Sequence, residues 1–379
     1  MIRRLTASVL LGSLMLLANV VAAAPSIPTL PSQSSIPAVS IKPIATITVV
    51  PDGTYRTGGF CRINYIPATG KFAVTFGTGE YGGPPNPENP QGQVYKEYTT
   101  ALEFTGRHGY FFWGGGDSAS VVVGNTYYFL TGGPRGLRLI KYDATNWNEQ
   151  RRVDIDIDQN SGEITSDQML VYVNGLLDAS SFYDPSKNPN PYQGAGTWHR
   201  FFNLDLGFVE RRVLNDQPHG NGSSMVFVDG SYHLVTSTAY FGDLLVMRYD
   251  QNWKFLGSKT LISQAQWPQG TVFDAQANRF YVAYTDNSRR PANNTHLAVF
   301  NQDWELLADT PVTNFQPGER KAAGRPWVMQ HGNRLYVSYD VNTMNAQGET
   351  NFDWQCLVSV YEVSGTSQVY LPLVFRNGH

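Results

Sequence analysis

The stretch SSMVFVDGSYHLVTSTAYFGDLLVMRYDQNWKFLGSKTL, residues 223–261, contains four short β-type segments separated by turns. The first two segments are joined by Asp229-Gly230, a dipeptide typical of two-residue hairpin turns. The third segment ends at Asp250, and Trp253 follows before the fourth begins. Apolar and polar residues alternate as in half-buried strands, and no 3.6-residue apolar period is present. The stretch therefore predicts a four-stranded antiparallel unit.

The same unit recurs in residues 270–310, where Trp304 again follows three positions after Asn301, the end of the third segment. We expect this Trp to serve packing, because it occupies a turn. Less regular copies occupy residues 60–112, 119–155, 168–214 and 325–363. The first segments begin near residues 60, 118, 168, 223, 271 and 326, a spacing close to the roughly 40–50 residues of one propeller blade. The predicted fold class is all-β, a six-bladed β-propeller with four-stranded antiparallel blades.

The last copy lacks a fourth segment of its own, whereas the strand-like Pro43–Val50 precedes the first copy. We infer that this segment completes the last blade and closes the ring, because closure removes exposed strand edges. Tyr370–Phe375 is the rival for that position. The propeller is accordingly placed at residues 43–370 and a C-terminal tail at residues 371–379.

The N-terminus has the three-part layout of a secretory signal peptide. Arg3 and Arg4 precede an apolar run, and the small residues Ala22–Ala24 follow it. We assign residues 1–23 to the signal peptide and residues 24–42, rich in Pro and Ser, to a linker. The apolar run is shorter than the roughly 20 residues of a membrane span. We expect a secreted protein, extracellular or associated with a cell surface, with no membrane span.

The amino-acid composition limits the classes of molecule that the protein is expected to bind. Charged residues make up 16% of the chain, the formal net charge is −3, and no block of Lys or Arg occurs. Nucleic acid is therefore not expected, because it is held mainly by clustered cations. We expect a monomer that binds a glycan or a small polar ligand. The two cysteines, Cys61 and Cys356, either pair as a disulfide between the first and last blades or remain two buried thiols.

Loop lengths indicate which face of the propeller is functional. The turns between first and second strands are minimal, whereas the loops between second and third strands are long, at residues 77–94, 183–196, 286–294 and 341–354. Function concentrates in loops held by a rigid scaffold, so we predict a site on this long-loop face. The first strands start there, and each is the innermost of its blade. Side chains at these starts are expected to surround a polar axial pocket or to plug the axis structurally.

The candidate site residues fall into two groups. Glycoside hydrolysis needs two carboxylates, one an acid and the other a base or nucleophile. The candidates for that pair are Glu80, Asp117, Asp167 and Asp340. The candidates for substrate binding are Arg62, His219, Asn221, Trp267, Arg325 and Trp327. The repeated Ser-x-Asp-x-Gly-x-Thr-Trp box of sialidases is absent, as are a G-x-S-x-G elbow and a phosphate-binding glycine loop.

One acidic segment has a spacing that could place several oxygens on one side of a loop. It contains Asp154, Asp156, Asp158 and Asn160, followed by Gly162. Calcium is bound by such oxygens, but the glycine does not fall at the position that an EF-hand loop requires. We favour a solvated connector between blades, with calcium as the alternative. No other cofactor is expected, and the histidines lack zinc-site spacing.

In its repeat layout the chain resembles the broad class of secreted bacterial β-propellers over residues 43–370. The resemblance is architectural and brings no catalytic motif with it. The function expected from the residues is recognition or processing of extracellular carbohydrate on the long-loop face. A glycosidase-like hydrolase and a non-catalytic, lectin-like protein both fit, and a protein-interaction or adhesion scaffold is the third candidate.

Overall fold

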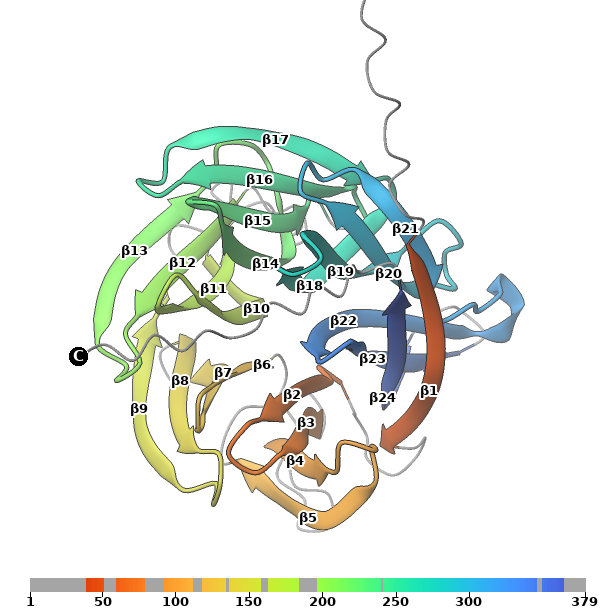
Figure 1. Ribbon diagram of the computed structural model, residues 1–379, viewed down its shortest axis with the longest axis horizontal. Coiled ribbons are helices and arrows are strands. Elements are labelled where there is room, and N and C mark those ends of the chain that lie inside the picture. Colours follow the sequence, from red (N-terminus) through yellow and green to blue (C-terminus); the bar gives the residue numbers. More distant parts are fainter. Residues whose placement is uncertain are drawn as a thin grey trace, which may run out of the picture. The chain divides into compact units, whose positions relative to one another are not determined.

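A computed structural model describes residues 39–50, 59–78, 92–111, 118–133, 136–157, 163–183, 196–239, 241–345 and 350–364. Within these ranges the chain forms six four-stranded antiparallel sheets and one short 3-10 helix, Pro317–Glu319. Figure 1 shows the six sheets arranged around a common centre. The predicted six-bladed β-propeller is confirmed. No helix in the described part of the chain is both long enough and apolar enough to span a membrane.

Blades 1 to 5 each use four consecutive strands, numbered from the centre outward. Blade 1 consists of β2 (Arg62–Ile66), β3 (Lys71–Thr78), β4 (Gly92–Tyr98) and β5 (Phe104–Phe111). Blade 2 consists of β6 (Ser118–Val123), β7 (Thr126–Gly133), β8 (Gly136–Asp143) and β9 (Glu149–Asp156). Blade 3 consists of β10 (Glu163–Val173), β11 (Leu176–Tyr183), β12 (Gly196–Phe202) and β13 (Phe208–Leu214).

Blades 4 and 5 repeat this order. Blade 4 consists of β14 (Gly220–Val228), β15 (Ser231–Ser237), β16 (Leu244–Asp250) and β17 (Phe255–Ile262). Blade 5 consists of β18 (Ala265–Asp274), β19 (Arg279–Asp286), β20 (Asn294–Asn301) and β21 (Leu306–Pro311). Blade 6 has β22 (Lys321–His331), β23 (Arg334–Met344) and β24 (Thr350–Ser364), and its outermost strand is β1 (Ser40–Val50).

Blade 6 is therefore built from both ends of the domain. β1 pairs antiparallel with β24, so that Ile47 lies opposite Val358 and Val50 opposite Cys356. This pairing confirms the prediction that Pro43–Val50 completes the last blade. The rival segment, residues 370–375, lies outside the described residues.

The first strands of blades 3 to 6 begin three to six residues before their predicted starts, for a common physical reason. Each contains a register shift near its beginning, such as those between Gly220 and Ser223 in β14 and between Gly324 and Trp327 in β22. An irregularity of this kind interrupts the inside-outside alternation on which the sequence prediction relied. The regular alternation becomes visible only after the shift.

The Trp that follows the third strand in blades 4 and 5 serves packing, as predicted. Trp253 stacks on Tyr232 at 4.1 Å and Trp304 on Phe280 at 4.0 Å, measured between ring centroids. The indole N–H of Trp304 donates to His233 in the preceding blade, and the Trp253 N–H donates likewise to Glu210 in blade 3. Each of these tryptophans therefore packs within its own blade and donates a hydrogen bond to the neighbouring blade.

Candidate functional site

Arg62 at the start of β2 links three blades from inside the fold. Its side chain is fully buried and donates hydrogen bonds to the carbonyl oxygens of Cys61 and Arg325, at 3.0 and 3.1 Å. It also donates to the Gln269 Oε1 of β18. Buried arginines are stable only when their donors meet acceptors in this way. Arg62 is thus an internal cross-link between blades 1, 5 and 6 rather than a side chain presented to a ligand.

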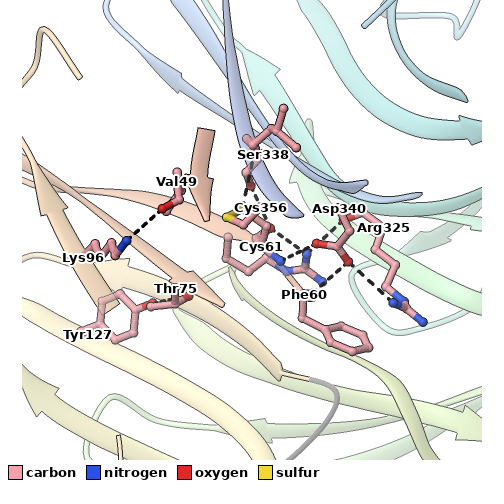
Figure 2. Close-up of a disulfide and its surroundings, with 12 residues drawn as sticks. Val49, Phe60, Cys61, Thr75, Lys96, Tyr127, Arg325, Ser338, Asp340 and Cys356 are labelled. Carbon is pink, nitrogen blue, oxygen red and sulfur yellow. Dashed lines mark hydrogen bonds and ion pairs between the residues drawn. A yellow bond between two sulfur atoms is a disulfide. The ribbon is translucent and has the colours of Figure 1, made fainter. Parts of the chain in front are cut away.

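Asp340 lies near the end of β23 and is also fully buried. Its two carboxylate oxygens accept hydrogen bonds from the backbone N–H groups of Phe60 and Cys61, both at 2.9 Å, and Arg325 lies 3.6 Å away (Figure 2). Burial raises the pKa of Asp340, and Arg325 and the two N–H groups oppose that rise. Both oxygens are committed to holding the segment before β2. These contacts favour a structural role for Asp340 over the catalytic role expected from the sequence.

Cys61 and Cys356 form a disulfide beside this carboxylate (Figure 2). The bond joins the residue before β2 to β24 across 295 residues of sequence. Together with the Asp340 hydrogen bonds, it fixes the junction between the first and last blades. This junction supports the part of the long-loop face described next.

Arg325 sits among three aromatic rings at the start of β22. Its guanidinium lies 4.2 Å from the ring of Phe60, 4.5 Å from Trp354 and 5.4 Å from Trp267. We call these four side chains the aromatic–arginine cluster. The Arg325 side chain is 19% exposed, and both tryptophans are partly exposed. The cluster therefore reaches the surface, whereas Arg62 and Asp340 beneath it do not.

Backbone strain accompanies the cluster. Phe60, Trp267 and Arg325 have φ angles of 57°, 53° and 49°, in the left-handed region that side-chain-bearing residues rarely adopt. Such conformations cost about 1–3 kcal/mol each and gather at functional sites when the surrounding structure enforces them. The neighbouring Gly324 packs under the Trp267 ring, where a Cβ would come within 3.1 Å. Sequence patterns do not reveal this strain, because it depends on contacts between blades 1, 5 and 6.

Trp327, two residues after Arg325 on β22, lines a central cavity. It is 7% exposed, and the Arg62 guanidinium lies 5.7 Å from its ring. The cavity has a volume of about 300 Å³ and is lined by all six innermost strands. Most of its lining is apolar, including Val121, Val171 and Val272. Its lining residues lie in the middle or second half of these strands, whereas the polar pocket was predicted at the strand starts, so this cavity is not the predicted pocket.

His219, directly before β14, is one of the polar candidates at the strand starts. It is fully buried, and burial lowers its pKa to about 4. Its Nε2 lies 3.1 Å from the hydroxyl of Thr197, which also contacts His199. His219 therefore belongs to a buried polar chain between blades 3 and 4. Neither Thr197 nor His199 had been singled out from the sequence, because no local motif links them to His219.

The described part of the acidic segment, at the end of β9, makes internal contacts. Asp154 pairs with Arg138 at 2.6 Å, and the backbone oxygen of Asp156 accepts a hydrogen bond from Arg200. Asp158 and Asn160 lie outside the described residues. Among the described residues, no three His, Cys, Asp or Glu side chains are grouped as metal ligands. The ion pair with Arg138 favours a structural role for Asp154.

The remaining candidates cannot be placed at the site. Glu80 and Asp117 lie outside the described residues. Asp167 and Asn221 belong to β10 and β14, but their side chains are not among those described. The site as described therefore consists of the aromatic–arginine cluster supported by Asp340, Arg62 and the disulfide.

Comparisons with known proteins support the fold and no more. No known protein family matches the chain, and no curated protein matches it. A protein of unknown function from Dyadobacter fermentans has a TM-score of 0.61 at 13% identity, over 85% of this chain and 99% of that chain. A subtype N11 neuraminidase-like protein from a flat-faced bat strain has a TM-score of 0.51 at 9% identity, over 88% and 98%. A subtype N10 neuraminidase-like protein from a little yellow-shouldered bat strain has a TM-score of 0.50 at 10% identity, over 85% and 98%.

Proposed function

We propose that this protein is a secreted carbohydrate-binding propeller and that its ligand contacts the long-loop face at the aromatic–arginine cluster. The supporting observation is the pair of partly exposed tryptophans, Trp267 and Trp354, that flank the Arg325 guanidinium. Indole faces stack against the C–H faces of sugar rings, and a planar guanidinium offers hydrogen bonds of fixed geometry to ring substituents. This combination is typical of a small polar-ligand site on a rigid scaffold.

Binding without hydrolysis is the better-supported form of the proposal. A retaining or inverting glycosidase needs two carboxylates that can exchange protons with substrate. Asp340 is engaged by two backbone N–H groups and Arg325, so it is not suited to that task. Of the four candidate carboxylates, Glu80, Asp117 and Asp167 are left for a hydrolytic pair. Secretion, which the N-terminal sequence suggests, fits a glycan ligand outside the cell.

A glycan array followed by calorimetric titration tests the binding proposal. We expect the wild-type protein to bind at least one glycan class and Trp354→Ala to weaken that binding at least about tenfold, through loss of a stacked ring. The matched control is Phe208→Ala, which removes an aromatic side chain that is 62% exposed on β13, away from the cluster. Binding that is absent in the wild type, or equally weakened in both variants, contradicts the proposal.

The same glycans, incubated with the protein and assayed for new reducing ends, separate binding from hydrolysis. We expect no release above the rate in buffer. Release that disappears in Asp167→Asn or Glu80→Gln would instead identify a hydrolase.

A further inference from the structure

Four buried side chains form one continuous hydrogen-bonded chain between blades 3 and 4. They are Asp178 on β11, Thr197 and His199 on β12, and His219 before β14, and each is at most 4% exposed. Asp178 Oδ2 lies 2.7 Å from His199 Nδ1, and His199 Nε2 lies 2.7 Å from Thr197 Oγ1. Thr197 Oγ1 in turn lies 3.1 Å from His219 Nε2. The chain ends where His219 Nδ1 meets the backbone oxygen of Gln217 at 2.8 Å.

The last contact fixes one protonation site. A carbonyl oxygen can only accept a hydrogen bond, so His219 Nδ1 must carry a proton and donate it to Gln217. When His219 is neutral, its Nε2 is therefore an acceptor. Burial lowers the pKa of His219 to about 4, which keeps the ring neutral near neutral pH.

Thr197 has one hydroxyl proton, but it faces the Nε2 atoms of two histidines. If His199 were neutral and donated its only proton from Nδ1 to Asp178, both Nε2 atoms would be acceptors. One of them would then lack a donor in a fully buried position, which is unfavourable. A proton on His199 Nε2 removes this conflict, because Nε2–H then donates to Thr197 Oγ1 and the Thr197 hydroxyl donates to His219 Nε2.

We propose that these four side chains form a buried proton-binding site. The site holds one proton more than it would if both histidines were neutral and Asp178 were ionised. The extra proton lies on His199 Nε2, and the negative charge of Asp178 compensates it from the other side of the ring. The proton between Asp178 Oδ2 and His199 Nδ1 can sit on either atom without changing this count. From His199 Nε2 onward the hydrogen bonds run in one direction: His199 donates to Thr197, Thr197 to His219, and His219 to the backbone oxygen of Gln217.

The surroundings leave the chain as a separate unit. Arg200, the next residue on β12, points to the other side of the sheet and pairs there with Glu163. On the same side, Arg212 of β13 lies across from His199 but is paired with Glu210. Asp216 lies in the connection before β14. Its negative charge favours proton binding at His219 and also at Tyr249 of β16. No second histidine partner for Asp178 occurs in the part of the chain that the structure describes.

The proton count governs the contact between the two blades. Loss of the extra proton leaves two Nε2 lone pairs facing one hydroxyl proton, so one of the two Thr197 contacts loses its hydrogen bond. When the hydroxyl turns to His199, the bond that is lost is the one to His219 at the start of β14, the innermost strand of blade 4. The site therefore couples pH to the packing of blade 4 against blade 3.

Nuclear magnetic resonance of the histidine ring nitrogens in the whole protein tests this directly. Signals are assigned by loss in His199→Gln and His219→Gln. At pH 7 we expect a proton on His199 Nε2, a proton on His219 Nδ1 and none on His219 Nε2. An unprotonated His199 Nε2, or a proton on His219 Nε2, overturns the proposal in the wild-type protein itself, whatever the variants do.

A hydroxyl-deletion pair supplies the second measurement. Thr197→Ser keeps the hydroxyl, whereas Thr197→Val has nearly the same shape and lacks it. We expect the Nε2 proton of His199 to exchange with solvent at least about tenfold faster in Thr197→Val than in Thr197→Ser, because its acceptor is gone. Equal exchange rates in two folded variants would mean that Thr197 does not receive this proton, and the chain as proposed would not exist.

Discussion

The indole N–H of Trp304 donates a hydrogen bond of 2.8 Å to Nδ1 of His233, across the boundary between blades 5 and 4. Nδ1 must therefore be unprotonated, and burial lowers the pKa of His233 to about 4. His219 has the same shift for the same principal reason. The two histidines make the propeller sensitive to acid at two separate blade boundaries.

Acidification should therefore destabilise the protein between about pH 6.5 and pH 4. In this window the unfolded chain binds protons at these histidines and the folded chain does not, so stability is complete above the unfolded pKa and falls as the pH falls. The loss should reach about 3 kcal/mol for each histidine. Urea denaturation at a series of pH values measures it. His233→Gln should flatten the dependence, whereas His108→Gln, at an exposed position, should leave it unchanged.

Asp340→Asn should cost about 3–5 kcal/mol, because the amide keeps one acceptor oxygen but removes the charge opposite Arg325 and turns an N–H donor toward the second backbone N–H group. The matched control is Asp154→Asn, which removes a carboxylate from a partly exposed ion pair with Arg138. That control should cost about 1 kcal/mol or less. Denaturant unfolding compares the two, and similar losses would show that the Asp340 contacts contribute little.

Removing the disulfide should loosen one specific junction. Cys61→Ser combined with Cys356→Ser is expected to lower stability by about 2–5 kcal/mol. Hydrogen exchange should accelerate first in β1 and β24, which meet beside Cys356. Uniform acceleration over all six blades would argue against a local role.

Gly270→Ala should be strongly destabilising, because an added Cβ would lie 2.6 Å from the backbone nitrogen of Val328 in the next blade. Backbone cannot move aside as a flexible side chain can, so the innermost strands of blades 5 and 6 would have to separate. Gly132→Ala places its Cβ in open space and serves as the control. A drop in melting temperature for Gly270→Ala alone is expected, and equal melting temperatures would refute the tight strand contact.

The blade repeat was readable because its signals are local. Asp229-Gly230, Trp253 and Trp304 lie within single blades, and together with the four less regular copies and their spacing they predicted six blades. The roles of the site residues were harder to predict from the sequence. Asp340 appeared to be a catalytic candidate, but its role depends on N–H groups 279 and 280 residues away, which no local pattern reports.

The proton chain shows the same limit. His199 and His219 belong to different blades, and only the curvature of the ring brings them to one hydroxyl. The left-handed conformations of Trp267 and Arg325 were likewise not predicted, because no local pattern at these positions indicates them. Sequence spacing predicted the scaffold, while contacts across blade boundaries determine the chemistry of its side chains.

The pairing of β1 with β24 has a consequence for biogenesis. The N-terminal strand emerges first from the ribosome, yet its partner is made last, with a delay comparable to the 295 residues that separate the two cysteines. At roughly 5–20 residues per second, that interval is about 15–60 seconds. During this time β1 has no partner, and an incomplete chain leaves the sixth blade without its outer strand. Blade 6 can therefore be completed only in a full-length chain. A truncated product keeps exposed strand edges, which are open to proteases and to aggregation.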